Sequence, residues 1–437
     1  MKSIWQNEIA LPKFPALKGN QKTDVLIIGG GITGILTAYF LQQRGISYIL
    51  VEKNRICSGT TGHTTAKITL QHGLIYDKLL HSFGMEKAGL YLQANEQALK
   101  QYELICRNID CDFEKKDNYV YSVDNRKKLE KEMDALGKLG YPARWCETPD
   151  IPICTAGAVC CPEQAQFHPL KFLANIAKDL NIYEGTFVNE MQGNTAITSN
   201  GKIVADKVIV TTHFPFINKH GSYFLKLYQH RSYVLALKGM ENSEKMQVNG
   251  MYVSEDKKGL SFRNYKDVLL LGGGAHRTGK KGGNWETLRA FVREHYSDAR
   301  ELFAWAAQDC MSLDKVPYIG RYSARTHELY TATGFNKWGM TGSMVAAGLL
   351  CDYVTGDKNE YADVFLPSRS MLKPQLAANI FETTANMLIP TQKRCPHLGC
   401  ALKWNGAEHT WDCACHGSRF AEDGKVLDNP ANGNLHI

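Results

Sequence analysis

The stretch VLIIGGGITG, residues 25–34, is a short apolar run that ends in a turn with glycines in the GxGxxG pattern. An amphipathic stretch follows at residues 35–43, and a second apolar run at residues 48–51 ends in Glu52. This acid lies about twenty residues beyond the glycines, the spacing typical of dinucleotide-binding sequences. A strand, a glycine turn, a helix, a strand and an acid in this order predict a βαβ unit that binds a dinucleotide. The alternative, an ordinary strand–turn–helix without a ligand, does not need all five parts.

Each part of this unit has a chemical role. Gly29 permits the tight turn, Gly31 lets backbone N–H groups approach a pyrophosphate, and Gly34 lets the helix lie close to its strand. The helix N-terminus then faces the phosphate charge, and the Glu52 carboxylate can accept hydrogen bonds from both ribose hydroxyls. The predicted cofactor contacts of this unit are Gly29, Gly31, Ile32, Thr33, Gly34, Glu52 and Lys53.

The size and composition of the chain limit its class. A chain of 437 residues is too long for one hydrophobic core, so we expect two or three domains. The chain contains no apolar stretch of membrane-spanning length, and its first residues lack the apolar block of a signal peptide, so we expect a cytoplasmic protein without a transmembrane segment. The net charge of +7 is modest and spread out, which favours solvated surfaces over a nucleic-acid partner.

The thirteen cysteines fall into two groups. Nine are scattered before residue 390 and are typical of free, buried thiols in a reducing compartment. The other four crowd into the twenty-one residues 395–415. The close spacing of this second group sets it apart from the scattered cysteines.

Paired cysteine and histidine residues near the end of the chain predict a metal centre. Cys395 and His397 form a Cys-x-His motif, and after fifteen residues Cys413 and His416 form a Cys-x-x-His motif. Two thiolates can bind one iron while two imidazoles bind the other, which is the Rieske 2Fe-2S arrangement. The same four ligands could also bind zinc tetrahedrally. The matched loops, each with an extra cysteine, and the Gly-Ser pair at 417–418 favour the iron–sulfur interpretation.

Two further segments are predicted to face the dinucleotide. The segment SGTTGHTT, residues 58–65, leaves the same sheet edge as Glu52 and is rich in small residues that can wrap a cofactor. A second glycine-rich turn, residues 334–342, opens a helix and can direct backbone N–H groups at an electron-rich group. From the first segment we expect contacts by Thr60, Thr61, Gly62 and Thr65.

Periodicity predicts the remaining elements. We expect helices at 84–107, 126–139, 169–180, 288–307 and 343–354, and strands at 118–123, 203–211, 231–238, 249–254, 259–264, 267–272 and 329–332. The strands between 231 and 272 suggest an antiparallel sheet, with the three glycines 272–274 as a loop at its edge. Residues 356–390 read as a docked linker.

The glycine unit, Val188 and the turn at 334–342 together resemble FAD-dependent oxidoreductases of the D-amino-acid oxidase type, which include glycine and sarcosine oxidases. The resemblance spans roughly residues 20–360 and is weak outside the motifs. It implies an α/β fold with a Rossmann-like FAD-binding domain, an antiparallel-sheet substrate domain and, from the tail, a small Rieske-type β domain. The implied boundaries are 1–75, 150–215 and 316–365 for the FAD-binding domain, 76–149 and 216–315 for the substrate domain, 366–390 for a linker and 391–437 for the Rieske domain.

The resemblance also assigns roles to single residues. It implies that the backbone of Val188 meets the adenine, that residues 60–65 border the flavin, and that Gly339, Met340 and Thr341 face the pyrimidine edge of the flavin. A helix N-terminus at that edge would stabilise the negative charge of the reduced flavin. Some amine oxidases of this family have a lysine near position 341 that activates oxygen, and Thr341 in its place argues against rapid oxidase chemistry.

The tail shows a similar match with departures. Cys400 and Cys415 resemble the disulfide that joins the two cluster loops in many Rieske proteins. Phe420 stands where high-potential relatives often have a tyrosine that donates to a ligand sulfur, which predicts a lower reduction potential, while Ser418 can still donate to a bridging sulfide. Ala414 replaces a usual proline. Because only about fifty residues remain for this domain, we expect the flavin domain to support it.

The two predicted cofactors suggest a dehydrogenase. A small amine or amino-acid-like substrate would reduce FAD, and an external one-electron acceptor would collect electrons from the 2Fe-2S cluster at exposed edges of His397 and His416. Alternatives are a reductase in which electrons run from cluster to FAD, and a redox-sensing or electron-transfer flavo-iron–sulfur protein in which the 400–415 bridge reports redox poise. A monooxygenase would need a nicotinamide site, for which the sequence has no second fingerprint. The sequence identifies no general base, and its candidates for substrate contact are Arg231, Tyr233, Arg263 and His276.

Overall fold

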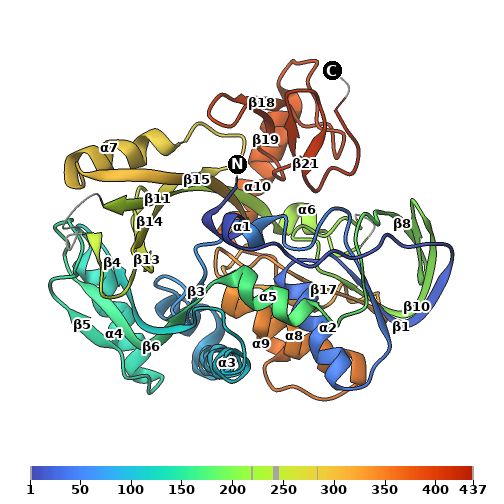
Figure 1. Cartoon of the computed structure of the whole chain (residues 1–437), viewed down its shortest axis with the longest axis horizontal. Coiled ribbons are helices and arrows are strands. Elements are labelled where there is room, and N and C mark those ends of the chain that lie inside the picture. The colour runs from blue at the N-terminus through green and yellow to red at the C-terminus, as the bar shows by residue number, and fades with distance from the viewer. Residues whose placement is uncertain (1, 218–219, 240–245, 283, 436–437) are drawn as a thin grey trace.

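Three β-sheets organise the chain, as the computed structural model shows (Figure 1). The structure describes residues 2–217, 220–239, 246–282 and 284–435. The first sheet is mainly parallel, the second mainly antiparallel, and the third is a small antiparallel sheet at the C-terminal end. No helix in these ranges is long and apolar enough to cross a membrane.

The first sheet has β1 at its centre, between β10 and β2. Residues of β1 point alternately to two separate cores: Val25 and Ile27 to one, Leu26 and Ile28 to the other. A strand that is buried on both faces needs a continuous apolar run, which is why residues 25–28 are all aliphatic. The strands are β1 (Gln21–Ile28), β2 (Tyr48–Val51), β7 (Ile182–Tyr183), β8 (Val188–Gln192), β9 (Thr195–Thr198), β10 (Gly201–Val210), β16 (Tyr318–Arg321) and β17 (Leu329–Thr333).

Apolar residues of helices α2 and α8 belong to the same core as Val25 and Ile27 of β1, on one face of this sheet. The predicted helix at 35–43 begins earlier, at Ile32, directly after the glycine turn. The predicted helix at 343–354 likewise begins at Gly339. The helices of this part are α1 (Ile4–Glu8), α2 (Ile32–Gln43), the 3-10 turn η1 (Thr60–His63), α5 (Pro169–Ala177), α6 (Tyr223–Lys226), α8 (Gly339–Thr355) and α9 (Ala362–Phe365).

The second sheet has the strand order β15-β11-β14-β13-β12-β4-β6-β3, with β5 paired to β6. Strands predicted between 231 and 272 are present and mainly antiparallel, except that β12 pairs with β4 in parallel. The helices of this part are α3 (Tyr76–Cys106, with a break at Gly84), α4 (Arg126–Lys138) and α7 (Trp285–His295). The strands are β3 (Lys67–Ile68), β4 (Glu114–Tyr121), β5 (Arg144–Cys146), β6 (Ala158–Gln166), β11 (Tyr228–Gly239), β12 (Met251–Ser254), β13 (Ser261–Tyr265), β14 (Val268–Arg277) and β15 (Ala299–Met311).

Two secondary-structure expectations for the second sheet were wrong. The helix expected at 288–307 ends at His295, because Ser297 and Asp298 form a turn and the chain then alternates as β15. The glycines 272–274 lie inside β14 rather than in a loop, and a Cβ at Gly273 would lie 2.6 Å from the Leu260 side chain. In addition, β6 belongs to this sheet, although the expected boundary at 150 placed it in the FAD-binding domain.

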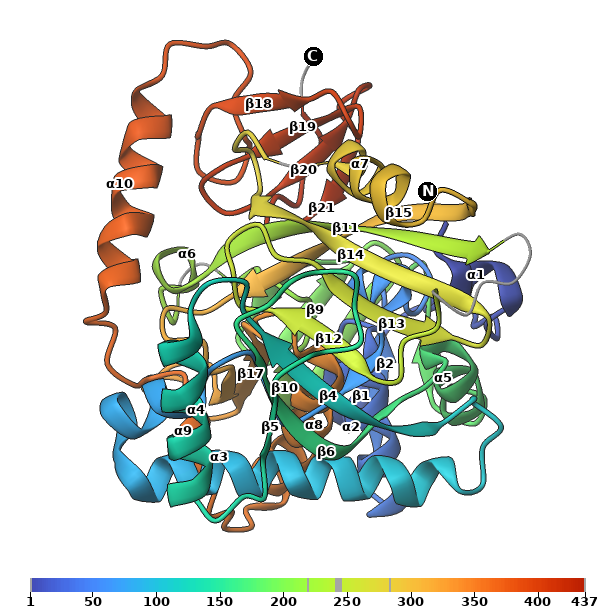
Figure 2. The same cartoon turned by 90° about the vertical axis from the view of Figure 1, so that its left-hand side faces the viewer.

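The C-terminal part follows helix α10 (Pro374–Leu388), which occupies most of the segment expected to be a linker. Four short antiparallel strands form its sheet: β18 (Leu402–Asn405), β19 (Thr410–Cys413), β20 (Arg419–Ala421) and β21 (Val426–Asp428). Figure 2 shows this sheet above β11, β14 and β15, with α10 standing along one side of the molecule. Its own buried core is small, as expected for so short a segment.

The cysteines before residue 390 are all free thiols. Seven are buried, Cys146 is half-buried and Cys154 is exposed. This agrees with the expectation of mostly buried thiols, which behave as small apolar side chains.

Candidate functional site

A cavity of about 890 Å³ lies between the carboxyl ends of the parallel strands and the second sheet. Such a crevice is where open α/β sheets bind their ligands. Among the residues predicted to contact FAD, those in the cavity wall are Gly29, Gly31, Ile32, Thr33, Glu52, Lys53, Thr60, Thr61, Thr65, Val188, Gly339 and Met340. Gly34, Gly62 and Thr341 lie outside this wall.

The glycine turn brings the strand and the helix together more closely than any side chain would allow. A Cβ at Gly34 would lie 2.0 Å from the carbonyl oxygen of Gly29, so the third glycine is required for the approach of α2 to β1. Gly29 has a φ of 115° and its Cβ would lie 2.8 Å from the carbonyl oxygen of Thr211. The first two residues of α2 line the cavity together with Gly31, so the N-terminus of this helix lies where a pyrophosphate could bind.

Glu52 lies at the end of β2 and lines the cavity. Its Oε2 accepts a hydrogen bond from the Gly30 N–H at 2.8 Å, and its Oε1 accepts one from the Asn54 N–H at 2.9 Å. Burial raises the pKa of this carboxyl, which these two bonds oppose. Because each carboxylate oxygen can accept a second hydrogen bond, ribose hydroxyls can still bind there.

Hydroxyl groups fix the backbone around the same cavity. The Thr61 hydroxyl accepts a hydrogen bond from the Ile32 N–H at 3.1 Å, which joins η1 to the first turn of α2. The Thr341 hydroxyl accepts from the Thr69 N–H at 2.9 Å and donates to the Thr69 carbonyl at 2.8 Å. Thr341 therefore ties α8 to the segment after β3, and its side chain is fully used in that contact.

Several charged residues of the cavity wall went unnoticed in the sequence. Burial, followed by the neighbouring Arg263, lowers the pKa of Lys67 to about 7. Burial also lowers the pKa of Lys337, raises that of Asp309 and lowers that of His230 to about 3. Of these four residues, only Lys337 lies in a sequence motif, the glycine-rich turn at 334–342. These groups give the cavity both positive and negative charge.

The four expected substrate contacts lie outside the cavity wall. Arg231 forms an ion pair with Glu408 of the C-terminal domain, and the Tyr233 hydroxyl donates to Glu408 at 3.3 Å. His276 stacks against Tyr233. Arg263 is fully buried and donates to the carbonyls of Thr65 and Ala66 through one nitrogen, while its other terminal nitrogen has no hydrogen-bond partner.

Strand parity explains why Arg231 and Tyr233 were misplaced. Along a strand, alternate side chains point to opposite faces, so an error of one residue exchanges the two faces. In β11 the cavity is lined by His230, Ser232 and Val234, the neighbours of the residues that were chosen. The odd-numbered side chains of this segment face the C-terminal domain instead.

The C-terminal loops bring the predicted cluster ligands together in pairs. A hydrogen bond between the two thiols lowers the pKa of Cys395 to about 7 and raises that of Cys413. The rings of His397 and His416 lie 5.0 Å apart, centroid to centroid, and nearly perpendicular. Two sulfur ligands on one side and two imidazoles on the other match the donor set of a Rieske cluster.

His416 is held in a form that suits metal ligation. Its Nε2 donates to the Phe224 carbonyl at 2.9 Å, so the proton sits on Nε2. Its Nδ1 is buried without a hydrogen-bond partner and is left to bind a metal. We expected this histidine to have an exposed edge, and that expectation was wrong. Its relative exposure is 1%, because the ring lies against Phe224 of the main body.

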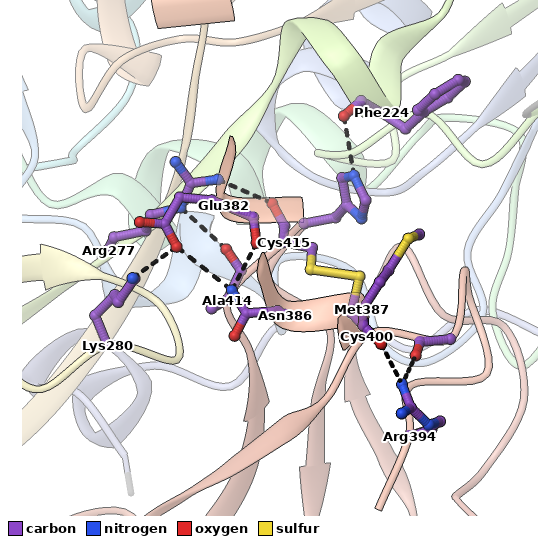
Figure 3. Close-up of a disulfide and its surroundings, with 12 residues drawn as sticks. Phe224, Arg277, Lys280, Glu382, Asn386, Met387, Arg394, Cys400, Ala414 and Cys415 are labelled. Atoms are coloured by element: carbon purple, nitrogen blue, oxygen red, sulfur yellow. Dashed lines mark hydrogen bonds and ion pairs between the residues drawn. A yellow bond between two sulfur atoms is a disulfide. The ribbon is translucent and has the colours of Figure 1, made fainter. Parts of the chain in front are cut away.

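A disulfide joins Cys400 of the first loop to Cys415 of the second (Figure 3). Arg277 of β14 donates to the carbonyls of Ala414 and Cys415 at 3.0 and 3.1 Å, and Lys280 forms an ion pair with Glu382 of α10. On the same interface Asn429 donates to the carbonyls of Thr212 and Phe214 at 2.7 and 2.8 Å. The main body therefore supports the small sheet, as its short length led us to expect.

The geometry thus defines a flavin-type oxidoreductase body that carries an iron–sulfur domain, and comparison with known proteins agrees. Residues 24–353 match the model of the FAD dependent oxidoreductase family DAO, and residues 368–437 match that of the Rieske [2Fe-2S] domain. The chain belongs to the DAO family of FAD-dependent oxidoreductases and has a C-terminal Rieske domain. It binds FAD in the first part and a 2Fe-2S cluster in the second, so both expected cofactors are confirmed.

Individual proteins are similar to the chain in sequence or in fold. The chain is 35% identical, over 98% of its own length and 96% of the other, to YhfW of Bacillus subtilis strain 168, which is described as a Rieske 2Fe-2S iron-sulfur protein. Glycine oxidase from Geobacillus kaustophilus superposes with a TM-score of 0.67 at 18% identity, covering 80% of this chain and all of that one. L-proline dehydrogenase from P. horikoshii superposes with a TM-score of 0.66 at 18% identity over 80% of this chain and 98% of its own. The predicted fold class is confirmed.

Proposed function

We propose that the protein is a dehydrogenase that oxidises a small amine or amino-acid-like substrate and passes the electrons through its Rieske domain to an external one-electron acceptor. When bound, FAD takes up the two electrons of a C–H bond as a pair, and a 2Fe-2S cluster carries electrons singly. The observation that carries the proposal is that β11 and β15 line the cavity on one face and support the cluster loops on the other. The two redox sites therefore share one wall.

The cofactor residues expected from the sequence are part of this proposal. The glycine turn and Glu52 would hold the dinucleotide end, and the segment 60–65 together with the start of α8 would hold the flavin ring. Cys395, His397, Cys413 and His416 would bind the cluster, as their paired geometry supports. The domain division also stays a proposal, with β6 moved to the substrate domain.

The polar groups of the cavity suit a zwitterionic or aminated substrate. Lys337 donates to the Ser232 hydroxyl at 3.0 Å and lies near Asp309, which attracts its charge. A carboxylate could pair with such an ammonium group, and an amine with the Asp309 carboxylate. The glycine oxidase and L-proline dehydrogenase named above act on amino acids, which supports the same substrate class.

The buried position of His416 redirects the exit of electrons. Since this ring faces the main body, the acceptor would approach the other side of the cluster, where Leu398 of the first loop is 37% exposed. We also propose a cytoplasmic location, which the free thiols before residue 390 support.

The test is anaerobic mixing of the holoprotein with a panel of small amines and amino acids. We expect one substrate class to bleach the flavin absorbance and then produce the electron paramagnetic resonance (EPR) signal of a reduced Rieske cluster. A Cys413→Ser variant, which lacks a cluster ligand, should show the bleaching without that signal. Bleaching by no substrate, together with a cluster that responds only to thiol reagents, would favour the redox sensor. Electron flow only from a reduced cluster to FAD would favour the reductase.

A further inference from the structure

A single layer of backbone separates the cavity from the cluster loops. In the paired strands β11 and β15, Arg231 lies opposite Gln308, and His230 lies opposite Asp309. The second pair lines the cavity, and the first pair points to the C-terminal domain, because side chains alternate along each strand. Figure 2 shows these strands directly beneath the small sheet.

Gln308 makes contacts on both sides of this layer. Its backbone carbonyl accepts a hydrogen bond from the Thr60 hydroxyl at 2.8 Å, and Thr60 lines the cavity. Its side-chain Nε2 donates to the Gly417 carbonyl at 2.8 Å, and its Oε1 accepts from the Thr278 hydroxyl at 3.0 Å. The side chain is 4% exposed, so water does not compete for these bonds.

Gly417 presses the second cluster loop against the same strands. Its φ is 84°, and a Cβ there would lie 2.2 Å from Cγ of Gln229 in β11. Its N–H donates to the carbonyl of Cys413 at 2.9 Å, and it directly follows His416. The Gly417 carbonyl belongs to the peptide between Gly417 and Ser418, and the Gly417 Cα and N–H connect it covalently to the proposed imidazole ligand His416.

We propose that Gln308 is the positioning residue that connects the two redox sites, along the route Thr60, Gln308, Gly417 and His416. This inference rests on the proposed function, because it names the route for electrons that the function requires. With both groups bound, each transfer would take one electron from the reduced flavin and give it to the oxidised cluster, and the proton released would pass to solvent. The route consists of covalent bonds and two short hydrogen bonds, without a gap between non-bonded groups.

Phe214 offers the competing route. It follows His213, which lines the cavity, and its ring lies 6.2 Å from that of His416, centroid to centroid. Electrons would have to cross between two non-bonded rings there, whereas the route through Gln308 is bonded throughout. The ion pair of Arg231 with Glu408 leads instead to the segment between β18 and β19, away from both cluster loops.

The test is flash photoreduction of FAD in the anaerobic holoprotein, with a photosensitiser and a sacrificial tertiary amine as the electron source. The rate of cluster reduction is then followed by transient absorbance and freeze-quench EPR. For Gln308→Leu we expect that rate to fall about tenfold, equivalent to about 1.4 kcal/mol, because the substitution removes the bond to the Gly417 carbonyl and leaves a gap in the route. The FAD content, the EPR g-values and the midpoint potential of the cluster should stay unchanged.

Matched variants separate the route from general loosening of the interface. Glu382→Gln removes the ion pair with Lys280 at the same interface, away from the route, and should leave the rate unchanged. Thr60→Val removes the cavity-side bond and should slow transfer even where Gln308→Leu does not fold. The inference is overturned where Gln308→Leu matches the wild type, where Glu382→Gln slows transfer equally, or where only Phe214→Leu slows it. No flavin-to-cluster transfer in the wild type would contradict the proposed function itself.

Discussion

The glycine turn at residues 29–34 and the paired loops at 395–400 and 413–418 belong to one chain but are built in opposite ways. The first exposes backbone N–H groups by leaving side chains out, and it directly follows β1, an inner strand of the mainly parallel sheet. The second depends on four side chains carried by two loops of a four-stranded sheet. The turn derives its rigidity from its own strand and helix, whereas the loops derive theirs from a disulfide and a neighbouring domain.

This difference indicates where each site is vulnerable. A change within the turn should remove its own cofactor and leave the distant loops intact. A change at the interface, far from any iron ligand, should disturb the loops because the small sheet has little core of its own. Four variants follow, from the largest expected effect to the smallest.

Gly34→Ala should abolish FAD binding while the protein keeps its iron. The added Cβ would lie 2.0 Å from the Gly29 carbonyl oxygen, so α2 must move away from β1. Overpacking of this kind costs about 1–3 kcal/mol, and more against backbone. Flavin absorbance and iron content of the purified protein measure the outcome. Gly348→Ala in α8 is the control, since nothing lies within 4 Å of its Cβ position, and it should bind FAD normally.

Arg231→Met should loosen the C-terminal domain without removing a single cluster ligand. The substitution leaves Glu408 buried beside Arg419 alone, and breaking a buried ion pair costs about 3–5 kcal/mol. Burial alone would raise the pKa of Glu408, but the charges of Arg231 and Arg419 together lower that pKa. Limited proteolysis near residue 370 and the rate of iron loss report the change. Arg289→Met, which removes a more exposed pair with Glu301, should cost under about 1 kcal/mol. Equal effects of the two variants would contradict the interface role.

The double variant Cys400→Ser/Cys415→Ser should weaken the small domain and spare the flavin site. The bridge closes a loop of 15 residues, for which chain-entropy estimates give about 3 kcal/mol. We expect faster release of iron to a chelator, with an unchanged affinity for FAD measured by fluorescence. Loss of FAD in this variant would show that the flavin site depends on the disulfide, and would contradict the independence of the two sites.

Lys67→Met should remove a pH dependence from the flavin-free protein. The folded pKa of Lys67 is lowered to about 7 from an ordinary value of 10.5. Between these values the unfolded chain binds more protons, so the free energy of unfolding rises with pH across that window, by at most about 1.4 kcal/mol per pH unit. Urea midpoints at pH 7 and pH 9 should differ less in the variant than in the wild type. An unchanged difference would show that Lys67 does not cause it.

The parts that the sequence predicted well are those whose residues lie close together in the chain. The βαβ unit is complete within residues 25–52, and the cluster motifs lie within residues 395–418, so their spacing carries the information. In contrast, the choice between Arg231 and His230 depends on which face of β11 meets the cavity, and that follows from the pairing with β14 and β15. The burial of His416 depends on a contact with Phe224, 192 residues away in the chain.

The strand at 299–311 shows a second limit. Its residues include Leu302, Phe303, Ala304 and Ala306, which also suit a helix, and the segment follows a true helix without a proline or glycine to separate them. Pairing with β11 over the whole length of the strand decides the outcome, because tertiary contacts override weak local propensity. Gln308, on which the proposed electron route depends, lies in this segment and carries no recognisable motif.

The two-faced use of β11 has a consequence for how this chain can vary. A one-residue insertion or deletion inside the strand would turn His230 and Ser232 toward the small sheet, and Arg231 and Tyr233 toward the cavity. Both redox sites would be damaged by a single event, even though no ligand is altered. Length changes should therefore be tolerated in the surface loops of this protein but not between residues 228 and 239. There, the insertion or deletion of a single residue would damage both the cavity wall and the interface with the small sheet.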